Sequence, residues 1–195
     1  MRDDQQQGRL RSLRSTGQRP PLMPDSAAAR LVDALHRKSM TIAGAESCTG
    51  GIVATSITAV PGASKVFAGA IVAYANASKT RILHVREELL ETYGAVSREC
   101  AVAMATGAAS VFGTDAGYGI TGIAGPAGGS PEKPVGTVWL AYWIKGRVQS
   151  ELLHLGGSRD DIRKGAADHV LLRLETEISR IFELDNPLDT GVSSR

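Results

Sequence analysis

The sequence has few aromatic side chains, few cysteines and little net charge. Aromatic residues make up 5% of the 195 residues, the formal net charge is +2, and the two cysteines, Cys48 and Cys100, form no spaced pattern. Scarce aromatic side chains argue against a surface on which nucleic-acid bases stack, and the small charge argues against a nucleic-acid partner. Two isolated thiols predict no disulfide framework, so we expect a reducing, cytoplasmic location.

Long apolar segments and metal-binding patterns are also missing. No apolar stretch reaches the ~20 residues that cross a membrane, so we expect no membrane partner. The histidines show no metal-ligand spacing, and none stands in a motif with an acid that predicts a Ser-His-Asp triad. The sequence therefore predicts neither a metal site nor a cofactor. These histidines are His36, His84, His154 and His169.

The composition of the chain is typical of one domain with two tails. Hydrophobic residues make up 43% and charged residues 22%, which is enough to fill a core and to keep the surface polar. Residues 1–25 carry Gln and Arg without apolar periodicity, and residues 185–195 are polar. We therefore expect a disordered basic tail over 1–25, a domain over 26–184 and a disordered tail over 185–195.

Strand-like and helix-like segments alternate along the domain. The order β-α-β-α-β-β-β-α predicts an α/β fold, a three-layer α/β/α single domain with a mixed β-sheet. The apolar run over residues 66–74 is typical of a buried strand. The expected strands are 40–45, 66–74, 117–121, 135–144 and 148–155. The expected helices begin at Ser26, Thr49, Ser78, Glu87, Ser97 and Ser158.

The segment Ala45-Glu46-Ser47-Cys48-Thr49-Gly50-Gly51 lies where the first strand turns into a helix. Ser47 there is either a nucleophile beside free backbone N–H groups or a helix N-cap. Cys48 is a competing nucleophile, because a helix N-terminus favours a thiolate, although an isolated cysteine is more often buried and inert. Glu46 is either a carboxylate at the helix start or a pocket residue.

Two further polar segments follow expected strands. Tyr74 and Lys79 follow the second strand, and a glycine-rich loop over 122–134 follows the third. Because ligands bind at the carboxyl ends of strands in α/β sheets, we expect these segments to form one pocket with Ser47. Lys79 is the candidate base if burial lowers its pKa, and Tyr74 a candidate relay for the proton. The alternatives are an exposed lysine and an exposed strand-end tyrosine.

Four segments occur in the order and spacing of one known family. They are 45–51, 69–79, 94–97 and 121–138, and together they resemble the carboxy-terminal domain of CinA, the family of nicotinamide-mononucleotide amidohydrolases. The resemblance spans about residues 25–183, and four motifs in register are far more specific than any one alone. The chain departs from the family pattern at Ala75, where the family often has Ser, and at Ala77-Ser78, where it often has Glu-Ala.

The resemblance implies a small-molecule substrate, nicotinamide mononucleotide, which is deamidated to nicotinate mononucleotide and ammonia for NAD salvage. It implies Ser47 as nucleophile, Lys79 as its base and Tyr74 between them. Backbone N–H groups at the helix start would bind the oxyanion or the 5′-phosphate, and the glycine-rich loop would close over the ligand. The substrate-binding residues expected on this basis are Glu46, Thr49, Gly50, Gly51, Asn76, Gly125, Gly128, Gly129 and Ser130.

A second function uses the same pocket without chemistry. In a non-catalytic, pyridine-nucleotide-binding regulatory module, Ser47 would only cap the helix and donate a hydrogen bond. Ammonia release distinguishes this module from the amidohydrolase. Because small α/β domains of this kind often assemble, we also expect a homo-oligomer.

Overall fold

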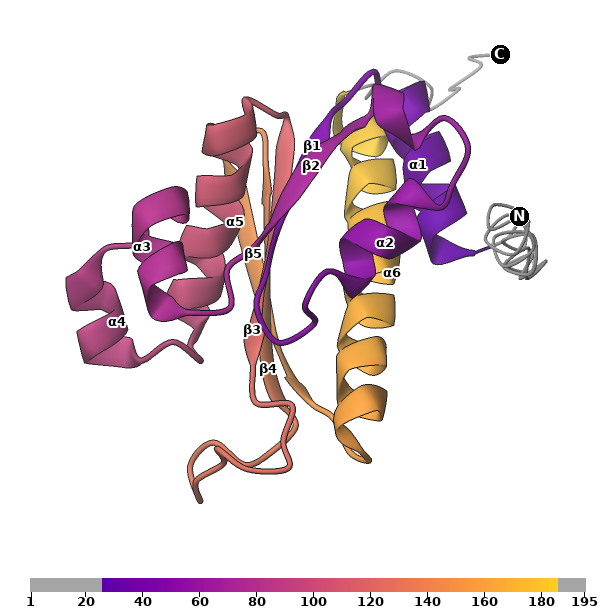
Figure 1. Cartoon of the computed structure of the whole chain (residues 1–195). Coiled ribbons are helices and arrows are strands. Elements are labelled where there is room, and N and C mark those ends of the chain that lie inside the picture. The colour runs from indigo at the N-terminus through magenta and orange to yellow at the C-terminus, as the bar shows by residue number, and fades with distance from the viewer. Residues whose placement is uncertain (1–25, 186–195) are drawn as a thin grey trace, which may run out of the picture.

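The computed structural model describes residues 26–185 and contains one mixed sheet of five strands (Figure 1). The strand order is β2-β1-β3-β4-β5, with β1 parallel to β2 and β3, and β4 antiparallel to β3 and β5. The fold is α/β, as the sequence predicts. The strands are β1 (Ile42–Glu46), β2 (Phe67–Val72), β3 (Ala116–Gly122), β4 (Thr137–Ile144) and β5 (Arg147–His154).

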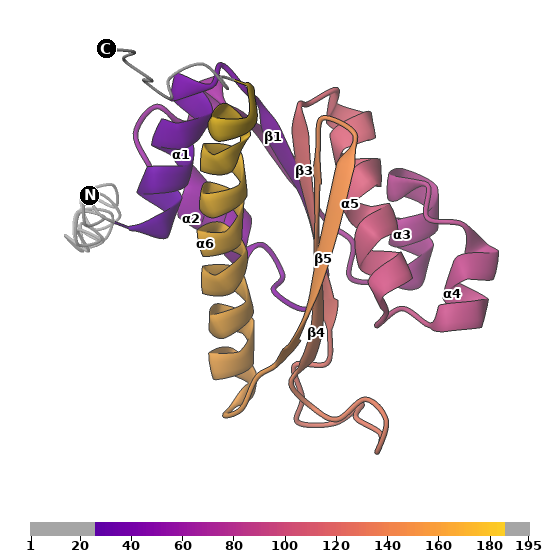
Figure 2. The same cartoon turned by 180° about the vertical axis from the view of Figure 1, so that it is seen from behind.

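Helices cover both faces of the sheet and so form the outer two of three layers (Figure 2). One layer contains α1, α2 and α6, and the other contains α5 against the sheet with α3 and α4 outside it. The 3-10 turn η1 (Ala63–Lys65) leads into β2. The helices are α1 (Ala27–Arg37), α2 (Ile52–Thr58), α3 (Asn76–Leu83), α4 (Glu87–Tyr93), α5 (Arg98–Phe112) and α6 (Arg159–Asp185).

Hydroxyl side chains begin several of these helices. Ser26 accepts the backbone N–H of Ala29 at 3.1 Å before α1, and Ser97 accepts that of Cys100 at 3.1 Å before α5. Each bond satisfies a donor that has no partner within the helix. Both helix starts are confirmed.

Glycines bring α5 unusually close to β3. A Cβ on Gly117 would lie 2.3 Å from the carbonyl oxygen of Ala105, and one on Gly119 would lie 2.3 Å from that of Ala101. Only residues without side chains allow this approach, and the helix face opposite is rich in alanine. The small residues thus fix α5, and the loop before it, against the strand ends that hold the candidate site.

Two sequence expectations about this region are wrong. The run 66–74 is not a buried strand, because β2 lies at the edge of the sheet and Val72 is 48% exposed. The second helix begins at Ile52 instead of Thr49, because Gly50 and Gly51 take positive φ values of 63° and 97°. Such values suit glycine and form a turn ahead of the helix.

The expected tails lie outside the described residues, apart from Asp185, which ends α6. Among residues 26–185, no helix combines the length and the apolar character that crossing a bilayer requires.

Candidate active site

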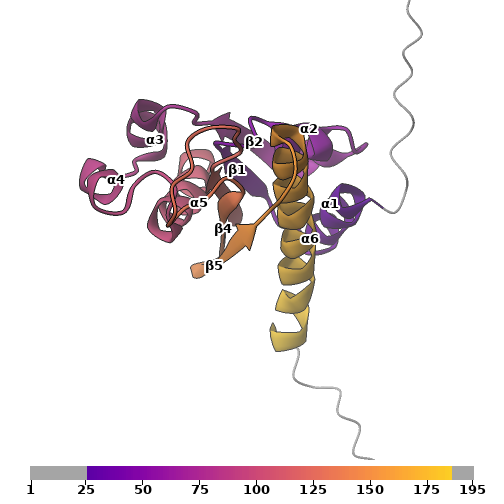
Figure 3. The ribbon, with the colours of Figure 1, turned by 90° about the horizontal axis from the view of Figure 1, so that it is seen from below.

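A cavity of about 250 Å³ lies at the carboxyl ends of β1, β2 and β3. Ser47 directly follows β1, Lys79 lies in α3 after β2, and Thr121 and Gly122 end β3. The β3–β4 connection and the start of α6 lie at the same edge of the sheet (Figure 3). The cavity is lined by Ser47, Cys48, Tyr74, Asn76, Lys79, Ala95, Val96, Thr121, Gly122, Ala124 and Arg159.

Ser47 and Lys79 meet at the bottom of this cavity. The Lys79 Nζ donates to Ser47 Oγ at 3.2 Å and to the carbonyl oxygen of Ala73 at 2.9 Å. Lys79 is only 1% exposed, so the alternative prediction of an exposed lysine is wrong. Ser47 does not cap α2 either, because the N-cap residue is Gly51. The two groups therefore form a buried pair of hydroxyl and amine.

Burial lowers the pKa of Lys79 from its ordinary value of 10.5, because removing water disfavours the ammonium form. The thiols of Cys100 and Cys48 act in the opposite direction to a smaller extent. Both acceptors of the Lys79 amine are uncharged, since one is a hydroxyl and the other a carbonyl. The neutral form of the Lys79 amine is therefore more accessible than that of a lysine in water.

The competing nucleophile Cys48 is poorly suited to the role. Burial raises the pKa of its thiol to about 11, and this effect exceeds the lowering by the backbone N–H groups of Cys48 and Thr49. The start of α2 therefore does not favour a thiolate at Cys48. At neutral pH the thiol keeps its proton and is a weak nucleophile.

The Glu46 side chain points away from the cavity. Its carboxylate is fully buried and accepts the backbone N–H groups of Gly51 and Ala54 at 2.8 Å and of Val53 at 3.3 Å. The Tyr118 hydroxyl donates to the same carboxylate at 3.3 Å. Glu46 is therefore the carboxylate at the start of α2, where the helix dipole favours negative charge, and it does not line the pocket.

The backbone N–H groups of Gly50 and Gly51, which were expected to bind substrate, already donate hydrogen bonds within the protein. The Gly50 N–H donates to the Ser47 carbonyl oxygen at 3.2 Å, and the Gly51 N–H donates to Glu46. Thr49 is fully buried, and its hydroxyl has no hydrogen-bond partner within the described part of the chain. The helix start therefore carries its own anion, and neither Gly50 nor Gly51 is free to receive another.

Two arginines from the start of α6 hold this edge together, and the sequence reasoning missed both. Arg163 donates to the carbonyl oxygens of Cys48 at 3.2 Å and Thr49 at 3.0 Å, which braces the turn after Ser47. Arg159 donates to the Tyr74 hydroxyl at 2.8 Å and to the Gly125 carbonyl oxygen at 2.7 Å. The only signal in the sequence is that both follow the cap at Ser158, directly after the last strand.

Tyr74 lies at the mouth of the cavity instead of between the nucleophile and the base. It is 61% exposed, and its hydroxyl bonds to Arg159, whereas Lys79 contacts Ser47 directly. Asn76, the first residue of α3, lines the same side. Tyr74 and Asn76 therefore share the pocket with the buried pair, without joining it.

The glycine-rich loop borders the cavity only at its beginning. Gly122 and Ala124 line the cavity. Gly125 does not, but its carbonyl oxygen accepts a hydrogen bond from Arg159, which does. The predicted binding residues Gly128, Gly129 and Ser130 do not line it, and the Ser130 N–H donates to the Lys133 carbonyl oxygen at 2.9 Å. The Lys133 ammonium fastens the loop by donating to the carbonyl oxygens of Tyr93 and Val96.

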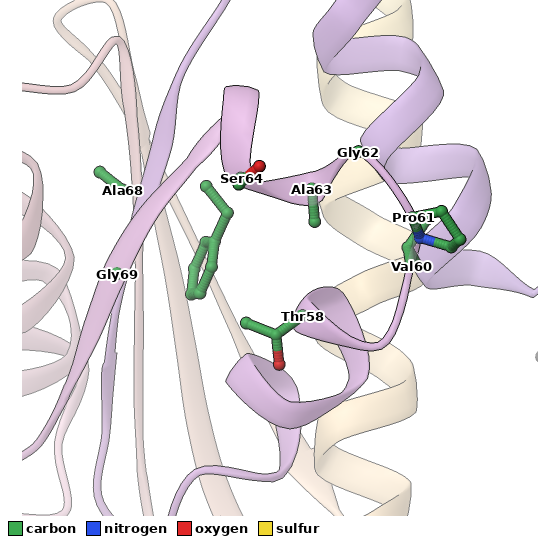
Figure 4. Close-up of a pocket in the computed structure, with 9 residues that line it drawn as sticks. Thr58, Val60, Pro61, Gly62, Ala63, Ser64, Ala68 and Gly69 are labelled. Carbon is green, nitrogen blue, oxygen red and sulfur yellow. The ribbon is translucent and has the colours of Figure 1, made fainter. Parts of the chain in front are cut away.

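A larger hollow, of about 480 Å³, lies elsewhere, between the end of α2, η1 and β2 (Figure 4). It is lined by uncharged residues such as Thr58, Pro61 and Ala68 and contains no titratable side chain. It therefore offers no acid, base or strong nucleophile. Among the described residues, no three His, Cys, Asp or Glu side chains gather as a metal ion would require.

Comparisons with known proteins agree with this fold. A CinA-like protein of Dictyoglomus thermophilum is 52% identical over 133 residues, and one of Mycobacterium tuberculosis is 49% identical over 149 residues. These matches cover 68% and 73% of the chain, but only 32% and 35% of the two relatives. The chain thus spans about a third of the length of the curated relatives it matches.

Solved structures match over nearly their whole length. A competence-damaged protein (CinA) superfamily protein of Klebsiella pneumoniae has a TM-score of 0.76 at 29% identity, covering 79% of this chain and 96% of its own. The competence/damage inducible protein CihA of Agrobacterium tumefaciens has a TM-score of 0.70 at 36% identity, covering 82% and 94%. The sequence profile of the CinA C-terminal domain matches residues 24–178. The chain therefore belongs to the CinA C-terminal domain family.

Proposed function

We propose that this chain is a serine amidohydrolase that deamidates nicotinamide mononucleotide to nicotinate mononucleotide and ammonia. The observation that carries the proposal is the 3.2 Å contact between the Lys79 amine and the Ser47 hydroxyl in a buried pocket. A serine needs an adjacent base to become a nucleophile, and a desolvated lysine is one of the groups that fill that role. The chain belongs to the CinA C-terminal domain family, and its resemblance to nicotinamide-mononucleotide amidohydrolases supports the choice of substrate.

In the proposed reaction, Ser47 is the nucleophile and Lys79 moves the protons. Neutral Lys79 takes the proton of Ser47 as Oγ bonds to the carboxamide carbon. The resulting ammonium then gives that proton to the departing nitrogen, so that the C–N bond breaks and ammonia leaves. Water attacks the acyl-enzyme, Lys79 accepts one of its protons, and the acid product is released as Ser47 recovers its hydrogen. The Ala73 carbonyl oxygen holds the amine in place throughout, 2.9 Å from Nζ.

The oxyanion of the tetrahedral intermediate requires hydrogen-bond donors near Ser47. Since Gly50 and Gly51 use their N–H groups within the turn, we assign this role to the N–H groups of Cys48 and Thr49.

The size and lining of the cavity fit one end of a nucleotide. About 250 Å³ is smaller than the pockets that enclose a whole drug-sized ligand, so the pyridine carboxamide would enter and the ribose phosphate would extend toward the mouth. Arg159 lies at that mouth, and its planar set of N–H donors suits a phosphate. Asn76 lines the cavity with a side-chain amide that can pair with the carboxamide.

An ammonia-release assay with a calorimetric titration tests the proposal. The protein should release ammonia from nicotinamide mononucleotide faster than from the nucleoside without phosphate or from free nicotinamide. Tight binding of the mononucleotide without ammonia over hours would reject the enzyme and leave the regulatory module. Ammonia from free nicotinamide alone would reject the nucleotide as substrate.

A further inference from the structure

One face of the sheet is left partly open at β4 and β5. Trp139 and Trp143, the two tryptophans of the chain, lie on this face and are only half-buried. Leu152 stands opposite Trp139, and Val148 stands opposite Trp143, with exposed fractions of 38% and 42%. Tryptophan is concentrated at the centres of protein interfaces, and an exposed apolar cluster of this kind marks a contact surface.

Helix α5 contacts both strands, yet it leaves Trp139 and Trp143 only half-buried. Ala141 of β4 packs against Ala101 and Ala105 of α5, whereas β5 is reached from α5 by Arg98, whose Nε donates to Ser150 Oγ at 2.9 Å. On the opposite face of the sheet, β5 is well covered, because Glu151 pairs with Arg173 of α6 at 3.1 Å and Leu153 lies in the core. The open area is therefore confined to one side of the last two strands.

The outer edge of β5 is also built for pairing. All eight of its residues pair with β4 without a register shift, and the strand contains no proline. The opposite edge, β2, differs because its register with β1 shifts at Ala68, which lies between the paired residues Phe67 and Gly69. Bulges and prolines are the usual protection of exposed strand edges. β2 carries such protection, and β5 does not.

We propose that β5 pairs antiparallel with β5 of a second copy of this chain, around a two-fold axis at Ser150. In this register Val148 lies opposite Leu152 of the second copy, and Leu152 lies opposite its Val148. Each pair of Val148 and Leu152 has a tryptophan at both ends. Trp143 of one copy lies beside Val148, and Trp139 of the other copy lies beside Leu152. A strand that pairs with itself in this way is self-complementary, as a two-fold interface requires.

The symmetric spacing of the apolar residues selects a second copy over an unrelated peptide. Val148 and Leu152 are each two residues from Ser150, so a single symmetric register buries both on the open face. On the other face, the acid of β5, Glu151, is already neutralised by Arg173, so the pairing brings no unpaired carboxylates together. The result is one continuous ten-stranded sheet with its two active-site cavities in separate copies.

Light scattering of the full chain at several concentrations tests this interface independently of the reaction. The native protein should have twice the single-chain mass of 20.5 kDa. Val148→Glu should raise the dissociation constant of the dimer about a hundredfold, because it places a charge in the apolar row. The matched control is Val111→Glu, which changes an equally exposed valine (43%) at the end of α5 and should leave the dimer intact.

Cysteine cross-linking tests the register. Ser150→Cys should form a disulfide between copies under mild oxidation, because directly opposed residues bring their Cβ atoms within reach of each other. Ser110→Cys, at an exposed position of α5, should not, and the native Cys48 and Cys100 are buried. A native monomer, a dimer that survives Val148→Glu, or a dimer that Ser150→Cys fails to cross-link would overturn the proposal.

Discussion

Glu46 and Ser47 are neighbours in sequence, yet their side chains bind different parts of the protein. The Glu46 carboxylate binds the N-terminus of α2, and the Ser47 hydroxyl binds Lys79. The carboxylate thereby fixes the backbone from which the hydroxyl projects. A change at Glu46 should therefore affect the fold and the placement of Ser47 together.

Glu46→Gln replaces one acceptor oxygen by an NH₂ group that faces backbone N–H donors. We expect it to lower the free energy of unfolding by about 2 kcal/mol, in the range for a buried group left unsatisfied. Urea denaturation measures this change. Tyr118→Phe is the control, because it removes a single longer bond of 3.3 Å and should lower stability by about 1 kcal/mol or less. Equal losses in the two variants would contradict this view of Glu46.

The pH dependence of turnover should report the lowered pKa of Lys79. The base works only when unprotonated, so kcat/KM should rise with pH and level off above that pKa, with a midpoint below 10.5. Lys79→Arg keeps its proton over this range and should be almost inactive at every pH. A midpoint at or above 10.5, or an unchanged profile in the arginine variant, would exclude Lys79 as the base.

Cys48 should be dispensable for the reaction. Its pKa of about 11 keeps the thiol protonated at neutral pH, so iodoacetamide should label it slowly and Cys48→Ala should stay within about threefold of native turnover. Peptide mass spectrometry follows the labelling. Rapid modification at neutral pH, with loss of activity that parallels it, would make Cys48 the nucleophile instead.

Arg159 should discriminate substrates that carry a phosphate. Arg159→Gln removes the charge at the mouth, so KM for nicotinamide mononucleotide should rise about tenfold or more while kcat changes little. For the same nucleoside without phosphate, KM should be unchanged. If both substrates lose affinity equally, Arg159 supports the pocket through Tyr74 and Gly125 without binding phosphate.

Gly44 should tolerate no side chain. A Cβ there would lie 2.0 Å from Cζ of the buried Tyr118 ring, so Gly44→Ala should destabilise the protein by about 3 kcal/mol. At Gly156 nothing lies within 4 Å of the same added atom, and Gly156→Ala should be nearly neutral. Thermal unfolding of the two variants measures the difference. Similar melting temperatures would show that the Tyr118 ring moves aside.

Local signals in the sequence predicted most of the elements. The helix expected to begin at Glu87 does so in the structure, and Ser97 caps α5 as expected. Patterns within one segment determine such features. The exposed position of β2 depends instead on strand order, which no local pattern encodes.

Some features of the candidate site could be predicted from local sequence, and others depend on the folded chain. The strand-to-helix turn indicated Ser47, and the carboxyl-edge rule indicated that Lys79 would be near it. The Glu46 side chain points to the N–H groups at the start of α2. The sequence predicts that this helix begins at Thr49, whereas it begins at Ile52, so the position of these N–H groups could not be predicted. Arg159 meets Tyr74 across 85 residues of sequence, and only the folded chain brings them together.

Ammonia release from nicotinamide mononucleotide by Ser47→Ala tests the central claim most directly. Loss of the nucleophile should lower kcat by about a thousandfold or more. Ser56→Ala should keep native turnover, since the Ser56 hydroxyl bonds the Ile52 carbonyl oxygen within α2, away from the cavity lining. Both variants should show the circular dichroism spectrum of the native protein. If correctly folded Ser47→Ala released ammonia within tenfold of the native rate, the Ser47–Lys79 pair would not be the catalytic centre.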